Sequence, residues 1–246
     1  MINRKLDLII EQHYASSKNV LYLYGARQVG KSYAIRKYAA EHYETYIELN
    51  FYKEPSLCQL VENARGPEDL LQRISLYAKK QIRRGESFIF FDEIQKCPVI
   101  VTMMKFLVEE GTCRYALSGS LLGVELKAKK RVMSWPVGYM SEKKVYPLDF
   151  EEFILALGVG GQVIDSLREC WKERKPVDEF VHNEMMRLFH LYLITGGMPA
   201  AVQTYIDTKD LIQVESVQKG ILTLYRQDIQ EYNPGKELRV NELFDL

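Results

Sequence analysis

Eight consecutive residues near the N-terminus carry the clearest chemistry in the sequence. Positions 25–32 read Gly-Ala-Arg-Gln-Val-Gly-Lys-Ser and fit the pattern G-x-x-x-x-G-K-[ST]. In this pattern the glycines let backbone N–H groups curl around a phosphate, the lysine reaches the β and γ oxygens, and the final hydroxyl binds Mg²⁺. The pattern predicts a site for a nucleoside triphosphate, with an ordinary strand-to-helix turn as the alternative. The predicted nucleotide contacts are Gly25, Ala26, Arg27, Gln28, Val29, Gly30, Lys31, Ser32 and the next residue, Tyr33.

An acidic pair supplies what such a phosphate site needs to hold its metal. The apolar run Phe88–Phe91 ends in Asp92 and Glu93, an arrangement known as Walker B. We expect Asp92, together with the hydroxyl of Ser32, to hold Mg²⁺, and Glu93 to polarise an attacking water as a general base. A solvated acidic pair at a strand end is the alternative interpretation.

Two serines and two arginines are further candidates for the reaction. Ser118 and Ser120 follow the next apolar run, where a hydroxyl could sense the γ-phosphate or orient the water, although Ser-Gly-Ser is also a plain turn. The predicted catalytic residues are thus Lys31, Glu93, Ser118 and Ser120. An arginine that neutralises transition-state charge is also expected, and Arg131 and Arg226 are the candidates.

These residues need a parallel sheet to bring them together. Apolar runs at 19–24, 45–49, 88–91, 114–117 and 143–146 predict strands that alternate with helical patterns, starting with a helix at 2–14. Alternation of this kind predicts an α/β core over residues 1–147. After Pro147 the chain reads as all helical through residue 232, beginning with a capping box formed by Asp149 and Glu152. Residues 233–246 start a new apolar pattern, so we expect a further, truncated domain there.

The composition narrows the class of protein. Apolar residues make up 47% and charged residues 27% of the 246 residues, which is typical of a globular domain. Lys plus Arg and Asp plus Glu each number 33, so the net charge gives no support to a nucleic-acid partner. No apolar run approaches the length of a membrane span, and the N-terminus does not read as a secretory signal. The four scattered cysteines predict reduced thiols in the cytoplasm, with a disulfide or metal framework as the alternative, and the scattered histidines support no metal other than Mg²⁺.

Five ordered segments resemble one protein family. In sequence and spacing, the chain resembles the prokaryotic AAA-type ATPases that carry a C-terminal domain of unknown function with a nuclease-like fold. The segments that carry the resemblance are Gly25–Ser32, Phe91–Pro98, Leu117–Ser120, Tyr146–Phe153 and Gly196–Pro199. The resemblance implies ATP as the ligand, a sheet of strand order 5-1-4-3-2, a helical lid and a chain that continues beyond Leu246.

The resemblance also bears on the lid and on the missing arginine. By similarity to nucleotide-switch ATPases with a Gly-x-Pro motif, residues 197–199 would pack on the adenine, so Met198 and Pro199 are assigned to the nucleotide. Many members have a Gly-Arg pair upstream of residue 147, but this chain reads Pro-Val-Gly-Tyr at 136–139. No arginine finger can therefore be carried over to that place.

The sequence thus predicts a cytoplasmic protein that binds ATP or ADP with Mg²⁺ and hydrolyses ATP slowly to drive a conformational switch. Two alternatives stay open. One is a regulatory module with little hydrolysis that acts through a missing C-terminal effector domain. The other is a small-molecule kinase, which would need an acceptor pocket and would not require the tandem acids. A homo-oligomer is a further expectation.

Overall fold

The computed structural model describes residues 2–119 and 136–232, and its contacts divide the chain into two units. One unit comprises Lys5–Ala26 and Gly30–Tyr146 and is called the sheet unit. The other runs from Pro147 onward, includes the residues before Lys5 and the segment Arg27–Val29, and is called the helical unit. The predicted serine Ser120, the candidate Arg131 and the expected further domain at 233–246 lie outside the described residues.

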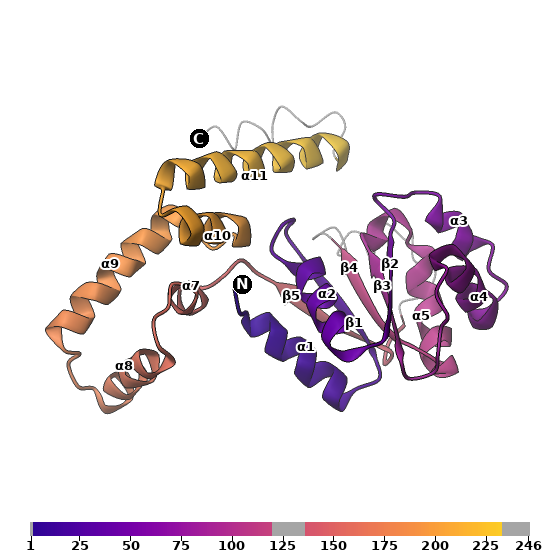
Figure 1. The fold of residues 1–246 in the computed structure, drawn as a ribbon, viewed down its shortest axis with the longest axis horizontal. Helices are drawn as coiled ribbons and strands as arrows, with labels where there is room; N and C mark the ends of the chain where they lie inside the picture. The colour runs from indigo at the N-terminus through magenta and orange to yellow at the C-terminus, as the bar shows by residue number, and fades with distance from the viewer. Residues whose placement is uncertain (1, 120–135, 233–246) are drawn as a thin grey trace. The chain divides into compact units, whose positions relative to one another are not determined.

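The sheet unit is built on five parallel strands (Figure 1). Their order across the sheet is β2-β3-β4-β1-β5, which confirms the predicted order 5-1-4-3-2 and the α/β fold. Parallel strands need crossover connections, and helices lie in the connections from β1 to β2, from β2 to β3 and from β3 to β4. The strands are β1 (Val20–Gly25), β2 (Thr45–Asn50), β3 (Ser87–Asp92), β4 (Arg114–Gly119) and β5 (Met140–Val145).

Helices cover both faces of this sheet (Figure 1). The helices α1 and α2 lie on one face, where Tyr14 and Tyr38 pack against Phe88 of the interior strand β3. The opposite face of the sheet packs against α3, α4 and α5, with Leu70 and Met104 among the buried contacts. Every residue of β3 is buried, as expected for a strand covered on both faces. The elements are α1 (Lys5–Ser16), α2 (Lys31–His42), α3 (Leu57–Glu62), α4 (Pro67–Ala78), the 3₁₀ turn η1 (Ile94–Lys96) and α5 (Val99–Glu110).

The edge strand β5 begins earlier than the sequence pattern indicated. It starts at Met140, whereas the pattern placed the strand at 143–146. Pairing with β1 sets its length, since Val20 lies opposite Met140 and Gly25 lies opposite Val145. The middle of this strand, Ser-Glu-Lys-Lys, is polar and largely exposed, so its side chains give little sign of a strand.

A disulfide corrects the prediction that all four cysteines are reduced thiols. Cys58 of α3 is bonded to Cys97, which follows η1, while Cys113 and Cys170 are free. The two bonded cysteines are 39 residues apart in sequence, but their Cα atoms are 5.4 Å apart, within the range that a disulfide needs. Their separation along the chain hid this proximity, because it arises only when α3 packs beside the segment after β3.

The helical unit contains five described helices after Pro147. The first, α7, begins at a capping box in which Asp149 accepts from the Glu152 N–H (2.8 Å) and Glu152 accepts from the Asp149 N–H (3.1 Å). This confirms the helix start expected from the sequence. Phe153 and Val202 are among the side chains of its small core. The helices are α7 (Phe150–Ala156), α8 (Gly161–Glu173), α9 (Glu179–Thr195), α10 (Pro199–Thr208) and α11 (Leu211–Tyr232).

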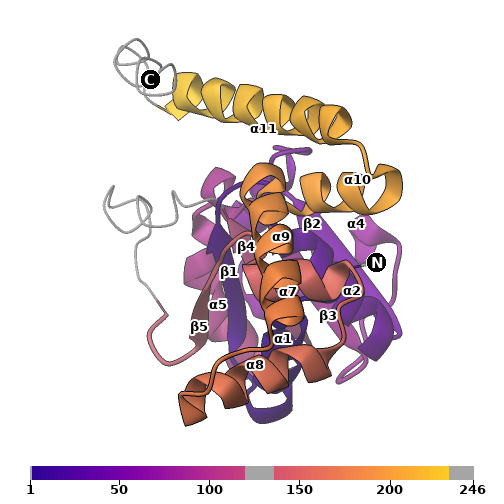
Figure 2. The same cartoon turned by 90° about the vertical axis from the view of Figure 1, so that its left-hand side faces the viewer.

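Within this unit the chain folds back on itself after α9. Gly196 ends α9 with a φ of 70°, a conformation that glycine adopts readily. The next residue, Gly197, lies against the backbone of Leu148, whose N–H donates to the Gly197 carbonyl (2.7 Å). After this turn, α10 lies beside the start of α11, as both views show (Figure 2).

Candidate nucleotide site

The carboxyl edge of the sheet gathers the polar residues at the strand ends. Because the strands are parallel, their last residues meet at one edge. In the strand register, Asn50 lies opposite Asp92, and Leu23, two residues before Gly25, lies opposite Ser118. The edge therefore places the phosphate-loop glycine, the Walker B aspartate and the β4 serine side by side.

The loop after β1 adopts backbone conformations that its glycines permit. Gly30 caps the N-terminus of α2 with a φ of 95°. Gly25 is also required sterically, because a Cβ there would lie 2.3 Å from the carbonyl oxygen of Val145 on β5. The Lys31 ammonium, on a side chain only 6% exposed, donates to the carbonyls of Gly25 (3.1 Å) and Ala26 (2.7 Å). Lys31 is thus held over the same loop whose N–H groups would cradle a phosphate.

Asp92 is the centre of the site. Its residue is 3% exposed, and its Oδ1 accepts hydrogen bonds from the hydroxyls of Ser32 (3.0 Å) and Ser118. Its Oδ2 accepts from the amide of Asn50 (2.8 Å). Hydroxyl and carboxylate oxygens are the ligands that Mg²⁺ prefers, so Ser32 and Asp92 fit that ion and would hold it here.

Glu93 has an unusual backbone conformation. It lies directly after β3 with φ 58° and ψ 48°, in the left-handed region that side chains other than glycine rarely adopt. Its carboxylate accepts a hydrogen bond from the side-chain amide of Gln95. Residues in such strained conformations cluster at functional sites.

A charged pair borders Asp92 on the side of β2. Arg36 of α2 binds both carboxylate oxygens of Glu48 at 2.8 and 2.7 Å, and its Nη2 is 3.9 Å from Asp92 Oδ2. Burial alone would raise the pKa of Glu48, but hydrogen bonds from Arg36 and Tyr46 outweigh it and lower that pKa. The hydrogen bonds with Glu48 likewise raise the pKa of Arg36. This pair therefore stays ionised and satisfies its own charge.

The other predicted site residues are placed as follows. Tyr33 is exposed on the first turn of α2. Met198 and Pro199 form the start of α10, and Arg226 lies in α11, all within the helical unit. Met198, Pro199 and Arg226 thus belong to a different unit from Asp92, and the roles of all four residues stay predictions.

Three residues that were not predicted from the sequence contact the acids of the site, namely Asn50, Arg36 and Gln95. Asn50 could have been predicted. It is a polar residue at the end of a strand, and polar residues at strand ends are what identified Asp92 and Ser118 as candidates. Arg36 lies four residues after Ser32 and thus on the same side of α2. Gln95 gave no such signal.

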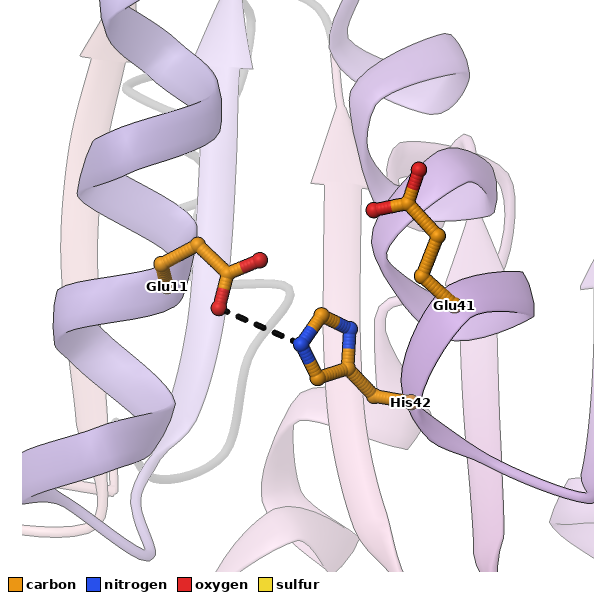
Figure 3. A group of neighbouring side chains, drawn as sticks. All are labelled: Glu11, Glu41 and His42. Atoms are coloured by element: carbon orange, nitrogen blue, oxygen red, sulfur yellow. Dashed lines mark ion pairs between the residues drawn. The ribbon is translucent and has the colours of Figure 1, made fainter.

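A separate group of possible metal ligands lies at the far end of α2. Glu11, Glu41 and His42 place ligand atoms within 4.8 Å of one another (Figure 3). His42 Nε2 is 3.3 Å from Glu11, and the ring stacks on Tyr38. Because Lys31 begins α2 and His42 ends it, this group is remote from the phosphate loop, and its ion pair ties α1 to α2.

In the part of the chain that the structure describes, no helix combines the length and apolar character required to cross a bilayer.

Two protein-family models match parts of this chain. A model described as "AAA domain" matches residues 17–154, and a model of a domain of unknown function, DUF8612, matches residues 186–246. None of the curated proteins matches this chain.

Solved structures show similar folds. The Walker-type ATPase PABY2304 of Pyrococcus abyssi is 16% identical over 95% of this chain and 77% of its own, with a TM-score of 0.55. PCH-2 of C. elegans is 12% identical over 89% of this chain and 65% of its own, with a TM-score of 0.42. The likeness to PABY2304 shows the fold. Since the first family model matches more than half of the 246 residues, the chain belongs to the AAA domain family.

Proposed function

We propose that this protein is an Mg²⁺-dependent ATPase of slow turnover whose hydrolysis cycle drives a conformational switch. The observation that carries the proposal is the hydrogen bond of 3.0 Å from the Ser32 hydroxyl to Asp92 Oδ1. Glu93 follows Asp92 in the chain and has a left-handed backbone conformation. Membership of the AAA domain family supports ATP binding, and the likeness to a protein described as a Walker-type ATPase supports hydrolysis.

Each residue has a defined task in the proposed reaction, in which ATP and water give ADP and phosphate. The loop N–H groups and Lys31 bind the phosphates, so Lys31 must exchange its two carbonyl partners for phosphate oxygens. When bound, Mg²⁺ neutralises charge on the β- and γ-phosphates. Glu93 accepts a proton from the attacking water, and the γ-phosphate is sensed by Ser118 or Ser120.

Several finer features belong to the same proposal. We propose the cytoplasm of a prokaryote as the location, a homo-oligomer as the assembly, and a C-terminal nuclease-like domain as the continuation of the chain. Nucleotide is the proposed partner and a membrane is not, while the net charge of zero gives no support to a nucleic acid. Disulfides such as Cys58–Cys97 are rare in a reducing cytoplasm. Alkylation of free thiols inside the native cells tests the location, because Cys58 and Cys97 should react if the compartment is reducing.

A second candidate is a nucleotide-binding regulatory module with little hydrolysis. The contacts of Lys31 with the loop carbonyls place its ammonium group at the phosphate loop, which both an ATPase and a nucleotide-binding module require. A small-molecule kinase is the third candidate, and it differs by releasing ADP only when an acceptor is added.

Single-turnover phosphate release from Mg·ATP tests the proposal. Glu93→Gln should bind ATP like the parent and lose release, whereas Lys31→Ala should lose binding. Glu169→Gln, which changes an exposed acid of α8 in the same way, is the matched control and should behave like the parent. Equal release by Glu93→Gln and the parent would remove Glu93 from its role, and tight ATP binding with no release at any protein concentration would favour the regulatory module.

A further inference from the structure

Asn50 is held next to Asp92 by the backbone of two paired strands. It ends β2 directly opposite Asp92, which ends β3. The N–H of the following residue, Phe51, donates to the Asp92 carbonyl (3.1 Å), and Phe51 is fully buried. The position of the Asn50 side chain is therefore set by the register of the sheet.

The contacts of Asn50 also define which end of its amide faces Asp92. Its Oδ1 accepts hydrogen bonds from the N–H groups of Tyr52 (3.1 Å) and Lys53 (2.8 Å). Backbone N–H groups can only donate, so that end of the amide must be the oxygen. The NH₂ end is then the one that donates to Asp92 Oδ2 (2.8 Å). An asparagine side chain that accepts from backbone N–H groups a few residues later forms a common type of turn. Here this turn holds the NH₂ group of Asn50 against the carboxylate of Asp92.

The two oxygens of Asp92 consequently have different tasks. Oδ2 accepts from the amide of Asn50, while Oδ1 accepts from the hydroxyls of Ser32 and Ser118. Rotation of the carboxylate would break the Asn50 bond in a site where Asp92 is only 3% exposed. Asn50 thus keeps Oδ1 turned toward the N-terminus of α2.

A neutral donor suits this task better than a cation. Arg36 lies 3.9 Å from Oδ2, but it binds both carboxylate oxygens of Glu48 at the shorter distances of 2.8 and 2.7 Å. A cation bound directly to Asp92 would offset the negative charge that attracts a metal. Asn50 orients the carboxylate without neutralising it, which is how partners outside the coordination shell tune a metal ligand.

We infer that Asn50 is the positioning residue of the metal site, which acts through Asp92 by presenting Oδ1 to Mg²⁺. The inference rests on the proposed function, since it assigns Asp92 to the metal. Asn50 touches neither nucleotide nor metal in this role. Its loss should weaken the Mg²⁺-dependent part of nucleotide binding and leave the metal-independent part unchanged.

The test is equilibrium binding of ADP and of a non-hydrolysable ATP analogue by calorimetry, in EDTA and across Mg²⁺ concentrations. Asn50→Ala should raise the half-saturating Mg²⁺ concentration about 10- to 100-fold, the usual effect of removing such a partner. Asn50→Ser separates the two contacts, because its hydroxyl can still accept from the loop N–H groups but is too short to reach Asp92. It should show the same rise. Asn63→Ala, the same change at an exposed position after α3, is the control and should match the parent.

A double-mutant cycle completes the test. Adding Asn50→Ala to Asp92→Ala should cause no further change, because the residue through which Asn50 acts is already gone. A wild-type response of Asn50→Ser to Mg²⁺, or an unchanged effect of Asn50→Ala in the Asp92→Ala background, would overturn the inference and leave Asn50 a loop anchor. If the parent itself binds nucleotide without any response to Mg²⁺, the proposed function fails instead.

Discussion

Replacing Gly197 with alanine should disrupt the helical unit at one identifiable contact. A Cβ at position 197 would lie 2.1 Å from the carbonyl oxygen of Leu148 and 3.0 Å from its nitrogen. Both neighbours are backbone atoms, so no side-chain rotation can relieve the overlap. Leu148 is itself 1% exposed, and its carbonyl already accepts from the hydroxyl of Tyr192 (2.8 Å). The two segments must therefore move apart.

The cost of that movement follows from the contacts that it breaks. The hydrogen bond from the Leu148 N–H to the Gly197 carbonyl is 2.7 Å long, and losing a bond of this kind costs about 1 kcal/mol. Displacing packed segments to fit an extra carbon costs about 1 to 3 kcal/mol more. Gly197→Ala should thus lower the free energy of unfolding of this unit by about 2 to 4 kcal/mol, a large part of the stability of an ordinary domain.

Hydrogen exchange by mass spectrometry measures this effect in each unit separately, which matters because a chain with two units need not unfold in one step. Amides of α7 and α9 should exchange faster in Gly197→Ala, whereas those of β1 and β3 should keep their protection. Gly220→Ala is the matched control, since its new Cβ meets nothing within 4 Å and alanine favours a helix interior by about 1 kcal/mol. Equal protection of α7 in Gly197→Ala and Gly220→Ala would show that the backbone at Leu148 accommodates a Cβ at position 197 without loss of stability.

Three further changes probe other contacts. Cys58→Ser should lower the unfolding free energy by about 3 to 4 kcal/mol without reductant, the chain-entropy value for a loop of 39 residues, and cause no difference with reductant; an equal loss under both conditions would contradict this. Glu48 has a lowered pKa and so stabilises the fold above about pH 4.5, with the effect lost as the pH falls through its folded pKa. The gap between the urea midpoints of the parent and Glu48→Gln should therefore shrink from pH 7 toward about pH 3, and a constant gap would rule this out. Asp149→Ala removes a helix cap and should cost about 0.5 to 2 kcal/mol in urea unfolding, whereas an unchanged midpoint would show that the cap contributes nothing.

The features that could be predicted from the sequence are those encoded in short segments. The buried run Phe88–Phe91 gave β3, because a strand covered on both faces needs no polar alternation. The phosphate-loop pattern located the turn between β1 and α2, and the Asp149–Glu152 spacing located the start of α7. Each signal lies within ten residues, so a single sequence displays it completely.

The features that could not be predicted depend on segments that meet only in the folded chain. Asn50 contacts Asp92 across 42 residues, and Cys58 reaches Cys97 across 39. Both pairs require β2 or α3 to be placed beside the segment around β3. The edge strand β5 was located three residues late for a related reason, because its length is set by pairing with β1 rather than by its own polar residues.

Two of the segments that resemble the family, Tyr146–Phe153 and Gly196–Pro199, contact each other through Leu148 and Gly197. Gly196 supplies the positive φ that ends α9, and Gly197 allows the backbone at Leu148, in the segment Tyr146–Phe153, to approach closely. The two glycines of Gly196–Pro199 are thus required by the fold, whether or not the residues after them touch a nucleotide. Pro199 also has a local task, since it occupies the first turn of α10, where its missing N–H costs nothing. Of the segment Gly196–Pro199, only the side chain of Met198 is left without such a structural reason, and Met198 is therefore the residue at which a nucleotide contact of this motif should be tested.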